Sequence, residues 1–228
     1  MRTAFISLVV VVSLASAAQA DYYDPPQGWS STPYFTHQQW EFSTADNPSG
    51  PEPGYVNPND VPSALVSGDV LWVGDPTPYG LQTARRGLWV TGSFTEATTG
   101  TVTLEVPNVA AWPEKLVWLQ LTYFLAGSLG AEYDSQLFTP GGEDIMVVVG
   151  SEMAVPVPGE AGWFYYEIMW HVMPQPDSET LQATINLPAG AVLALDEVAV
   201  DTICLPEPAT LGLLATGGLA LLPRRRRG

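Results

Sequence analysis

Residues 115–125 read KLVWLQLTYFL, and this stretch decides the fold class. Its odd-numbered positions from Val117 to Leu125 are all apolar or aromatic, whereas Trp118, Gln120 and Thr122 stand between them. Side chains of a β-strand point alternately to its two faces, so a period of two predicts a strand with one face in a core. We therefore expect a half-buried strand here.

The same alternation recurs on both sides of this stretch. It is found in residues 101–106, 164–172 and 181–187, and the turn-forming pairs Pro107-Asn108, Gly141-Gly142 and Pro158-Gly159 separate the runs. No segment between the two ends has the pattern of an amphipathic helix of ten residues or more. Eight or nine strands at this spacing predict an all-β fold, an antiparallel β-sandwich of the jelly-roll type.

The first twenty residues have the layout of a secretory signal peptide. Arg2 supplies the positive charge, residues 4–15 form an apolar run, and Ala18 and Ala20 place small residues where signal peptidase requires them. The run is too short for an ordinary membrane span. We expect a signal helix over residues 1–20, cleavage after Ala20 and a mature chain that begins at Asp21.

Residues 206–228 form a second signal with three parts. Pro206, Glu207 and Pro208 come first, the apolar residues 209–222 follow, and Arg224, Arg225, Arg226 and Arg227 close the chain. As a helix of about 1.5 Å per residue, the apolar part would span roughly 21 Å, less than the ~30 Å hydrocarbon core of a bilayer. The arginines should stay on the cytoplasmic face, which places everything before Ala209 outside.

This arrangement resembles the PEP-CTERM sorting signal of bacteria, whose three parts occur in the same order. In that family an exosortase, a membrane-embedded cysteine protease of the transpeptidase type, recognises the tail. Its members are mostly surface, biofilm or extracellular-polysaccharide-associated proteins. The resemblance implies that the tail directs sorting and that the chain meets the membrane only through this segment.

The part before the tail resembles a group of exported proteins that carry the same sorting signal and to which no activity is assigned. The shared stretches are THQQWEFST (residues 36–44), KLVWLQLTY (residues 115–123) and VDTICLPEPAT (residues 200–210). We therefore divide the chain into a signal peptide (1–20), a Pro/Gly/aromatic-rich wrapping segment (21–62), a β-sandwich domain (63–205) and the sorting signal (206–228).

Charge excludes one class of function. Between Asp21 and Leu205 only Arg85, Arg86 and Lys115 are basic, against twenty-three Asp and Glu residues, a net charge of about −20. Such a surface repels nucleic-acid phosphates and anionic lipid headgroups, so we expect no nucleic-acid partner. The single cysteine, Cys204, allows no disulfide within the chain.

Two kinds of binding site are compatible with the sequence. Trp118, Trp163 and Tyr165 stand on the less apolar faces of their strands and are candidates for stacking on sugar rings, although large aromatic side chains more often fill a core. Asp196 and Asp201 are candidates for a calcium site, since carboxylates are the oxygen ligands that calcium prefers. No motif indicates any other cofactor.

No catalytic constellation stands out, so we expect a non-enzymatic protein of the cell surface or extracellular matrix. The alternative is a carbohydrate-binding module, with or without calcium, and a hydrolase ranks third. The expected partners are signal peptidase, an exosortase-type membrane protease and, for the folded domain, an extracellular polysaccharide. The chain should be exported and anchored in the inner membrane only transiently, through its tail.

Processing at both ends can be tested on material released from the cell surface. We expect its amino terminus to be Asp21 and its peptide map to lack residues 211–228, because both hydrophobic segments act as removable signals. Amino-terminal sequencing and mass spectrometry provide the measurement. A released chain that begins at Met1 or keeps its arginine tail would contradict the expectation.

Overall fold

The computed structural model describes residues 25–32, 34–76, 87–109, 112–127, 132–140 and 144–205. The expected signal helix and the expected carboxyl-terminal helix lie outside these ranges, as do Ala18, Ala20 and the sorting motif. Within the described ranges, no helix has the length and apolar character needed to cross a membrane.

The described residues form a short 3₁₀ helix, η1, followed by strands alone. The elements are η1 (Trp29–Ser31), β1 (Phe35–Trp40), β2 (Ser63–Gly68), β3 (Val70–Val73), β4 (Leu88–Ser93), β5 (Thr98–Pro107), β6 (Glu114–Ala126), β7 (Glu132–Phe138), β8 (Asp144–Val147), β9 (Met153–Pro156), β10 (Trp163–Met173), β11 (Ser178–Leu187) and β12 (Ala191–Leu205).

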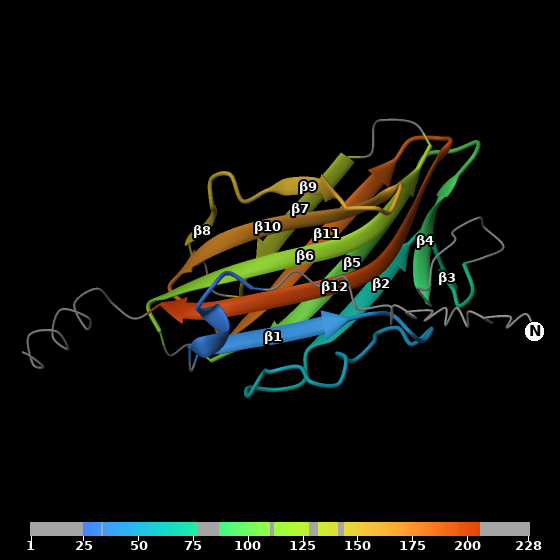
Figure 1. Ribbon diagram of the computed structural model, residues 1–228. Helices are drawn as coiled ribbons and strands as arrows, with labels where there is room; N and C mark the ends of the chain where they lie inside the picture. Colours follow the sequence, from blue (N-terminus) through green and yellow to red (C-terminus); the bar gives the residue numbers. More distant parts are fainter. Residues whose placement is uncertain are drawn as a thin grey trace, which may run out of the picture.

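The strands form two antiparallel sheets that pack face to face (Figure 1). Sheet A has eight strands in the order β3-β4-β12-β6-β10-β8, with β1 paired to β12 and β9 paired to β10. Sheet B has four strands in the order β2-β5-β11-β7. Successive strands repeatedly change sheets, so the connections between the layers lie at the two ends of the sandwich.

Strand β12 is the centre of sheet A. It pairs with β6 along nearly its whole length, and on its other side it pairs first with β4 and then with β1. The register against β6 shifts at Asp196, between Leu195 and Glu197. This β-bulge changes which residues face sheet B, because one extra residue moves every later side chain to the opposite face. Leu195 and Val198 therefore both point into the core.

The core lies between the sheets and is built by the alternating residues that the sequence indicates. From sheet A it receives Leu119 and Ile168, from sheet B Leu104 and Leu181, and all four side chains are at most 2% exposed. Trp40 of β1 is fully buried in the same cluster. The segment 21–62 thus contributes a strand and two core residues, Trp40 and Phe42.

The predicted fold class is confirmed: the chain is an all-β, antiparallel sandwich. The strand number differs from the expected eight or nine, since the four-residue strands β3, β8 and β9 are too short to show an alternation. In the segment 21–62, strand β1 ends at Trp40. The backbone of Phe42 turns away there with a positive φ of 49°.

Truncating one core residue tests the layer arrangement. Leu119→Ala should lower the free energy of unfolding by about 2–5 kcal/mol, because it leaves a cavity between tightly packed sheets. Leu65→Ala on β2 is the matched control; its side chain is 43% exposed, so little should change. Urea unfolding followed by tryptophan fluorescence gives both values. Equal losses in the two variants would contradict the arrangement.

Candidate functional site

The side of sheet A that points away from sheet B is the outer face, and it carries an unusual set of side chains. On β6 the residues between the core positions are Trp118, Gln120 and Thr122, and on β10 they include Tyr165 and Glu167. In the antiparallel register, Tyr165 lies opposite Thr122 and Glu167 lies opposite Gln120. Aromatic and hydrogen-bonding groups therefore occupy adjoining positions on two central strands.

Strands β12 and β1 extend this pattern. Because of the bulge at Asp196, Glu197, Ala199 and Asp201 point to the outer face, opposite Thr122, Gln120 and Trp118 respectively. On β1, His37 lies opposite Asp201 and Gln39 lies opposite Ala199. Ala199, which lies opposite Gln120, is the smallest residue of this set.

Gln120 is the most informative residue of the outer face. Its side chain is 7% exposed, and among the residues that the structure describes neither Nε2 nor Oε1 has a hydrogen-bond partner. A buried amide without partners costs about 1–3 kcal/mol per unsatisfied group, and folded proteins contain few of them. The amide therefore has one acceptor oxygen and two donor hydrogens that no group in the described ranges occupies.

The carboxylates around Gln120 are held by neighbours. The side chain of Asp201 is fully buried, and its Oδ1 lies 2.9 Å from Nδ1 of His37. Burial raises the pKa of Glu167 above its usual value of 4.5, and a hydrogen bond from Trp118 partly offsets this rise. The carboxylates of Asp201 and Glu167 thus have neighbours on adjoining strands that orient them.

The three aromatic residues predicted from the sequence all lie on this face, in different surroundings. Trp118 is 7% exposed and meets Trp29 of η1 edge to face, with ring centroids 6.2 Å apart. Tyr165 is half-buried on β10. Trp163 is 5% exposed and packs with Leu88, Val157 and Ala194 into a second, smaller hydrophobic cluster. Tyr165 packs against the same cluster as Trp163, and it is also diagonal to Gln120 in the register of β6 and β10.

The predicted calcium ligands are placed apart. Asp196 forms the bulge and is 9% exposed, while Asp201 is paired with His37 further along β12. In the part of the chain that the structure describes, no group of three or more His, Cys, Asp or Glu residues could hold a metal ion. Asp196 and Asp201 thus share no cluster of such residues within the described ranges, and calcium binding stays a prediction.

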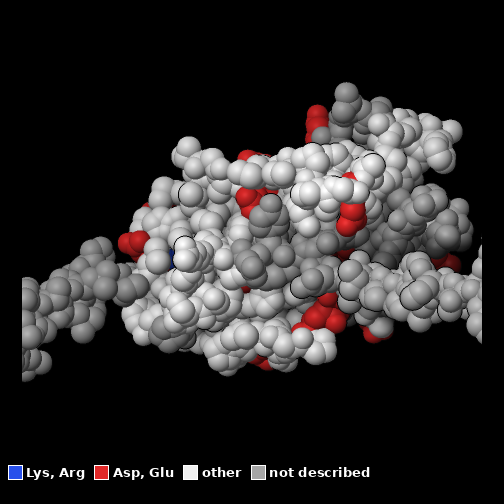
Figure 2. Space-filling model, in the orientation of Figure 1, with Lys and Arg blue, Asp and Glu red and all other residues white. Residues whose placement is uncertain are grey.

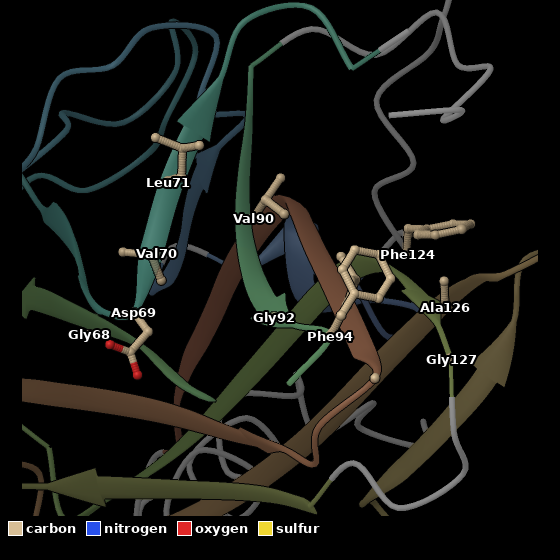
Figure 3. A pocket seen from close by; sticks show the side chains of 12 residues that line it. Gly68, Asp69, Val70, Leu71, Val90, Gly92, Phe94, Phe124, Ala126 and Gly127 are labelled. Carbon is tan, nitrogen blue, oxygen red and sulfur yellow. The ribbon is translucent and has the colours of Figure 1, made fainter. Parts of the chain in front are cut away.

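An apolar pocket of about 660 Å³ lies at the far end of the outer face (Figure 3). Leu71 on β3 forms one side, Val90 on β4 the middle, and Phe124 and Phe94 the other side. Phe94 is 86% exposed, and the one carboxylate in the lining is Asp69. Phe124 follows Trp118, Gln120 and Thr122 along the same face of β6, so pocket and polar residues share one strand.

Gln120, Gln39 and Glu167 were missed as site residues by the sequence analysis. Their positions between core residues were visible in the period-two pattern, but a polar residue there is ordinarily a solvent-exposed one. Burial is the property that makes Gln120 unusual, and it depends on packing that no local pattern reports. A glutamine flanked by apolar residues on both sides was the available signal.

No family model and no curated protein matches this chain. Among solved structures, it is similar to the carbohydrate-binding module TmCBM61 in complex with β-1,4-galactotriose, with 15% identity and a TM-score of 0.40 over 60% of this chain and 86% of that one. It is also similar to TmCBM27, a carbohydrate-binding module studied for specific mannan recognition, with 11% identity and a TM-score of 0.32 over 73% of this chain and 97% of that one.

Glu167 predicts a pH dependence of stability. Because its pKa in the fold lies above 4.5, the folded chain binds this proton more tightly than the unfolded chain does. Its contribution to stability is therefore complete below pH 4.5 and is lost as the pH rises through the higher folded value. As the pH rises from 4.5 to that higher folded value, the unmodified protein should therefore lose stability that Glu167→Gln keeps.

Urea unfolding at several pH values measures this difference. Glu132→Gln, which alters an exposed carboxylate on β7, is the control and should follow the unmodified protein. Parallel curves for the unmodified protein and Glu167→Gln would show that Glu167 has no such role.

Proposed function

We propose that this chain is an exported carbohydrate-binding protein, without catalytic activity, that holds a saccharide on the outer face of sheet A. The buried, unpartnered amide of Gln120 between Trp118, Tyr165 and Glu167 carries the proposal. A ligand on this face would supply the hydrogen bonds that the amide lacks.

The chemistry of a sugar ring matches this set of side chains. Each hydroxyl group both donates and accepts, and a glutamine amide offers one acceptor and two donor hydrogens in return. Glutamate oxygens accept further hydroxyl hydrogens, while the C–H face of a sugar ring packs on an indole or phenol ring. Trp118 and Tyr165 lie on neighbouring strands on either side of this polar centre.

Charge narrows the class of saccharide. Figure 2 shows acidic groups in separate patches on this side of the molecule, over a surface that is otherwise mostly uncharged. Lys115, the one basic residue in the described ranges, is buried. An anionic polysaccharide would be repelled by this field, so a neutral one is the expected ligand.

Export and sorting complete the proposal, and they rest on the two ends of the sequence. β12 ends at Leu205, directly before Pro206 of the sorting motif. A binding domain released or held at the cell surface by exosortase processing would meet extracellular polysaccharide there. The expected partners are therefore signal peptidase and exosortase for processing, and a neutral polysaccharide for the folded domain.

Gln120→Leu provides the sharpest test, because it separates binding from stability. Replacing a buried unsatisfied amide by an apolar side chain of similar size should leave stability unchanged or raise it. If the amide binds the saccharide, affinity should fall about tenfold or more, equivalent to about 1.4 kcal/mol. Gln182→Ala on β11 of sheet B is the control and should bind as the unmodified protein does.

Binding can be measured by a glycan array and then by calorimetry. The ligands named for the two similar structures, β-1,4-galactotriose and mannan, are convenient first probes alongside other neutral glycans. A bound glycan whose affinity is unchanged in Gln120→Leu would place the site elsewhere on the molecule. A chain that binds no neutral glycan would contradict the function itself.

A further inference from the structure

A buried polar cluster joins the two sheets at the end of the sandwich where β6 begins and β12 ends. Lys115 on β6 of sheet A is 1% exposed, and Glu179 on β11 of sheet B is fully buried. Lys115 is one of three basic residues between Asp21 and Leu205, yet its charge lies inside the protein. Burying a charged pair is costly, so this placement calls for an explanation.

The cluster contains more than an ion pair. Lys115 Nζ lies 2.7 Å from Oε1 of Glu179 and donates to its Oε2 at 2.8 Å. The same Oε1 accepts a hydrogen bond of 3.0 Å from Nδ2 of Asn108, which follows β5. One carboxylate oxygen of Glu179 therefore touches both the lysine amine and the asparagine amide nitrogen.

The carbonyl oxygen of the same asparagine also has a donor. Nε2 of Gln175 donates to Oδ1 of Asn108 at 2.8 Å, and a second bond of 2.7 Å to the carbonyl oxygen of Val109 holds Gln175 in place. Gln175 is 4% exposed. A fixed donor on a carbonyl oxygen stabilises the negative charge that develops there when a nucleophile attacks the carbon.

Burial makes Glu179 a stronger base. Desolvation raises the pKa of its carboxyl group, and the nearby Lys115 opposes this rise. Its carboxylate lies within hydrogen-bond distance of Nζ of Lys115, so it can take a proton from that nitrogen. A deprotonated lysine amine is the activated nucleophile of covalent catalysis.

We propose that Lys115 and Asn108 react to form an intramolecular isopeptide bond. Nζ of Lys115 attacks Cγ of Asn108, a new C–N bond forms, and the bond from Cγ to Nδ2 breaks. Glu179 takes a proton from Nζ and delivers it to Nδ2, which leaves as ammonia. Gln175 stabilises the charged Oδ1 during the step. The reaction exchanges one amide for another, so it needs no oxidant, metal or co-reactant.

Such a bond would add a covalent link to a chain whose single cysteine allows none within it. It would close the connection between β5 of sheet B and β6 of sheet A. It would also fix the end of the sandwich from which the sorting segment leaves, since Lys115 lies opposite Cys204 in the register of β6 and β12.

Peptide mapping of the purified, folded full chain tests the bond. Lys115 is the one tryptic site between Arg86 and Arg224, and trypsin does not cut after an acylated lysine. We expect the peptide 87–115 to be absent from the digest of the denatured protein. A protease that cuts after glutamate should yield peptides 106–114 and 115–132 joined, and lighter than their sum by one ammonia. Recovery of free peptide 87–115 would overturn the proposal.

Variants locate the reaction. Asn108→Ala removes the electrophile but keeps the pair of Lys115 and Glu179, so tryptic cleavage at Lys115 should return completely. Glu179→Gln should prevent the bond as well, and circular dichroism checks its fold. Glu105→Gln, an exposed carboxylate on β5, is the control that keeps the link. Continued resistance of Lys115 to trypsin in Asn108→Ala would overturn the assignment.

Discussion

The backbone pairing of β6 with β12 is the interaction on which the rest of the structure depends. These two strands lie at the middle of sheet A, and every other strand of that sheet is joined to one of them directly or through one neighbour. On the side away from β6, β12 pairs with β4 and β1, and on the side away from β12, β6 pairs with β10. Their inward residues form about a third of the main core cluster, and their outward residues form the centre of the candidate site.

The bulge at Asp196 decides which of these residues serve which purpose. Leu193 and Leu195 face the core before it, and Val198 and Val200 face the core after it. An uninterrupted strand would instead turn Glu197 and Asp201 inward, where carboxylates would be buried among apolar side chains at high cost. The bulge therefore keeps an apolar core and gathers carboxylates on the outer face, next to Gln120 and Trp118.

The alternation of apolar and polar residues was enough to predict the long strands β6, β10 and β11, because each of them has one face buried in the core. It could not predict the partner of a strand, so the position of β1 beside β12 required the structure. Part of the candidate site could be predicted from the sequence, since the alternation pointed to Trp118 and Tyr165. The burial of Gln120 could not be predicted, because it arises from contacts between distant segments. The same holds for the contact of Asn108, Lys115 and Glu179. The bulge residue Asp196 was read as a metal ligand, since a one-residue register shift leaves no compositional mark.

The path by which β12 leaves the sandwich has a mechanical consequence. The strand continues to Leu205, and the proposed sorting segment follows it in the sequence. A pull on that segment would act along the strand axis, and the hydrogen bonds to β6 and β1 run across this axis. Such a load is shared by many hydrogen bonds in shear, so they do not open one after another. A domain that binds a polymer on its outer face, as proposed, would bear tension between that polymer and its carboxyl-terminal segment through the pairing of β6 with β12.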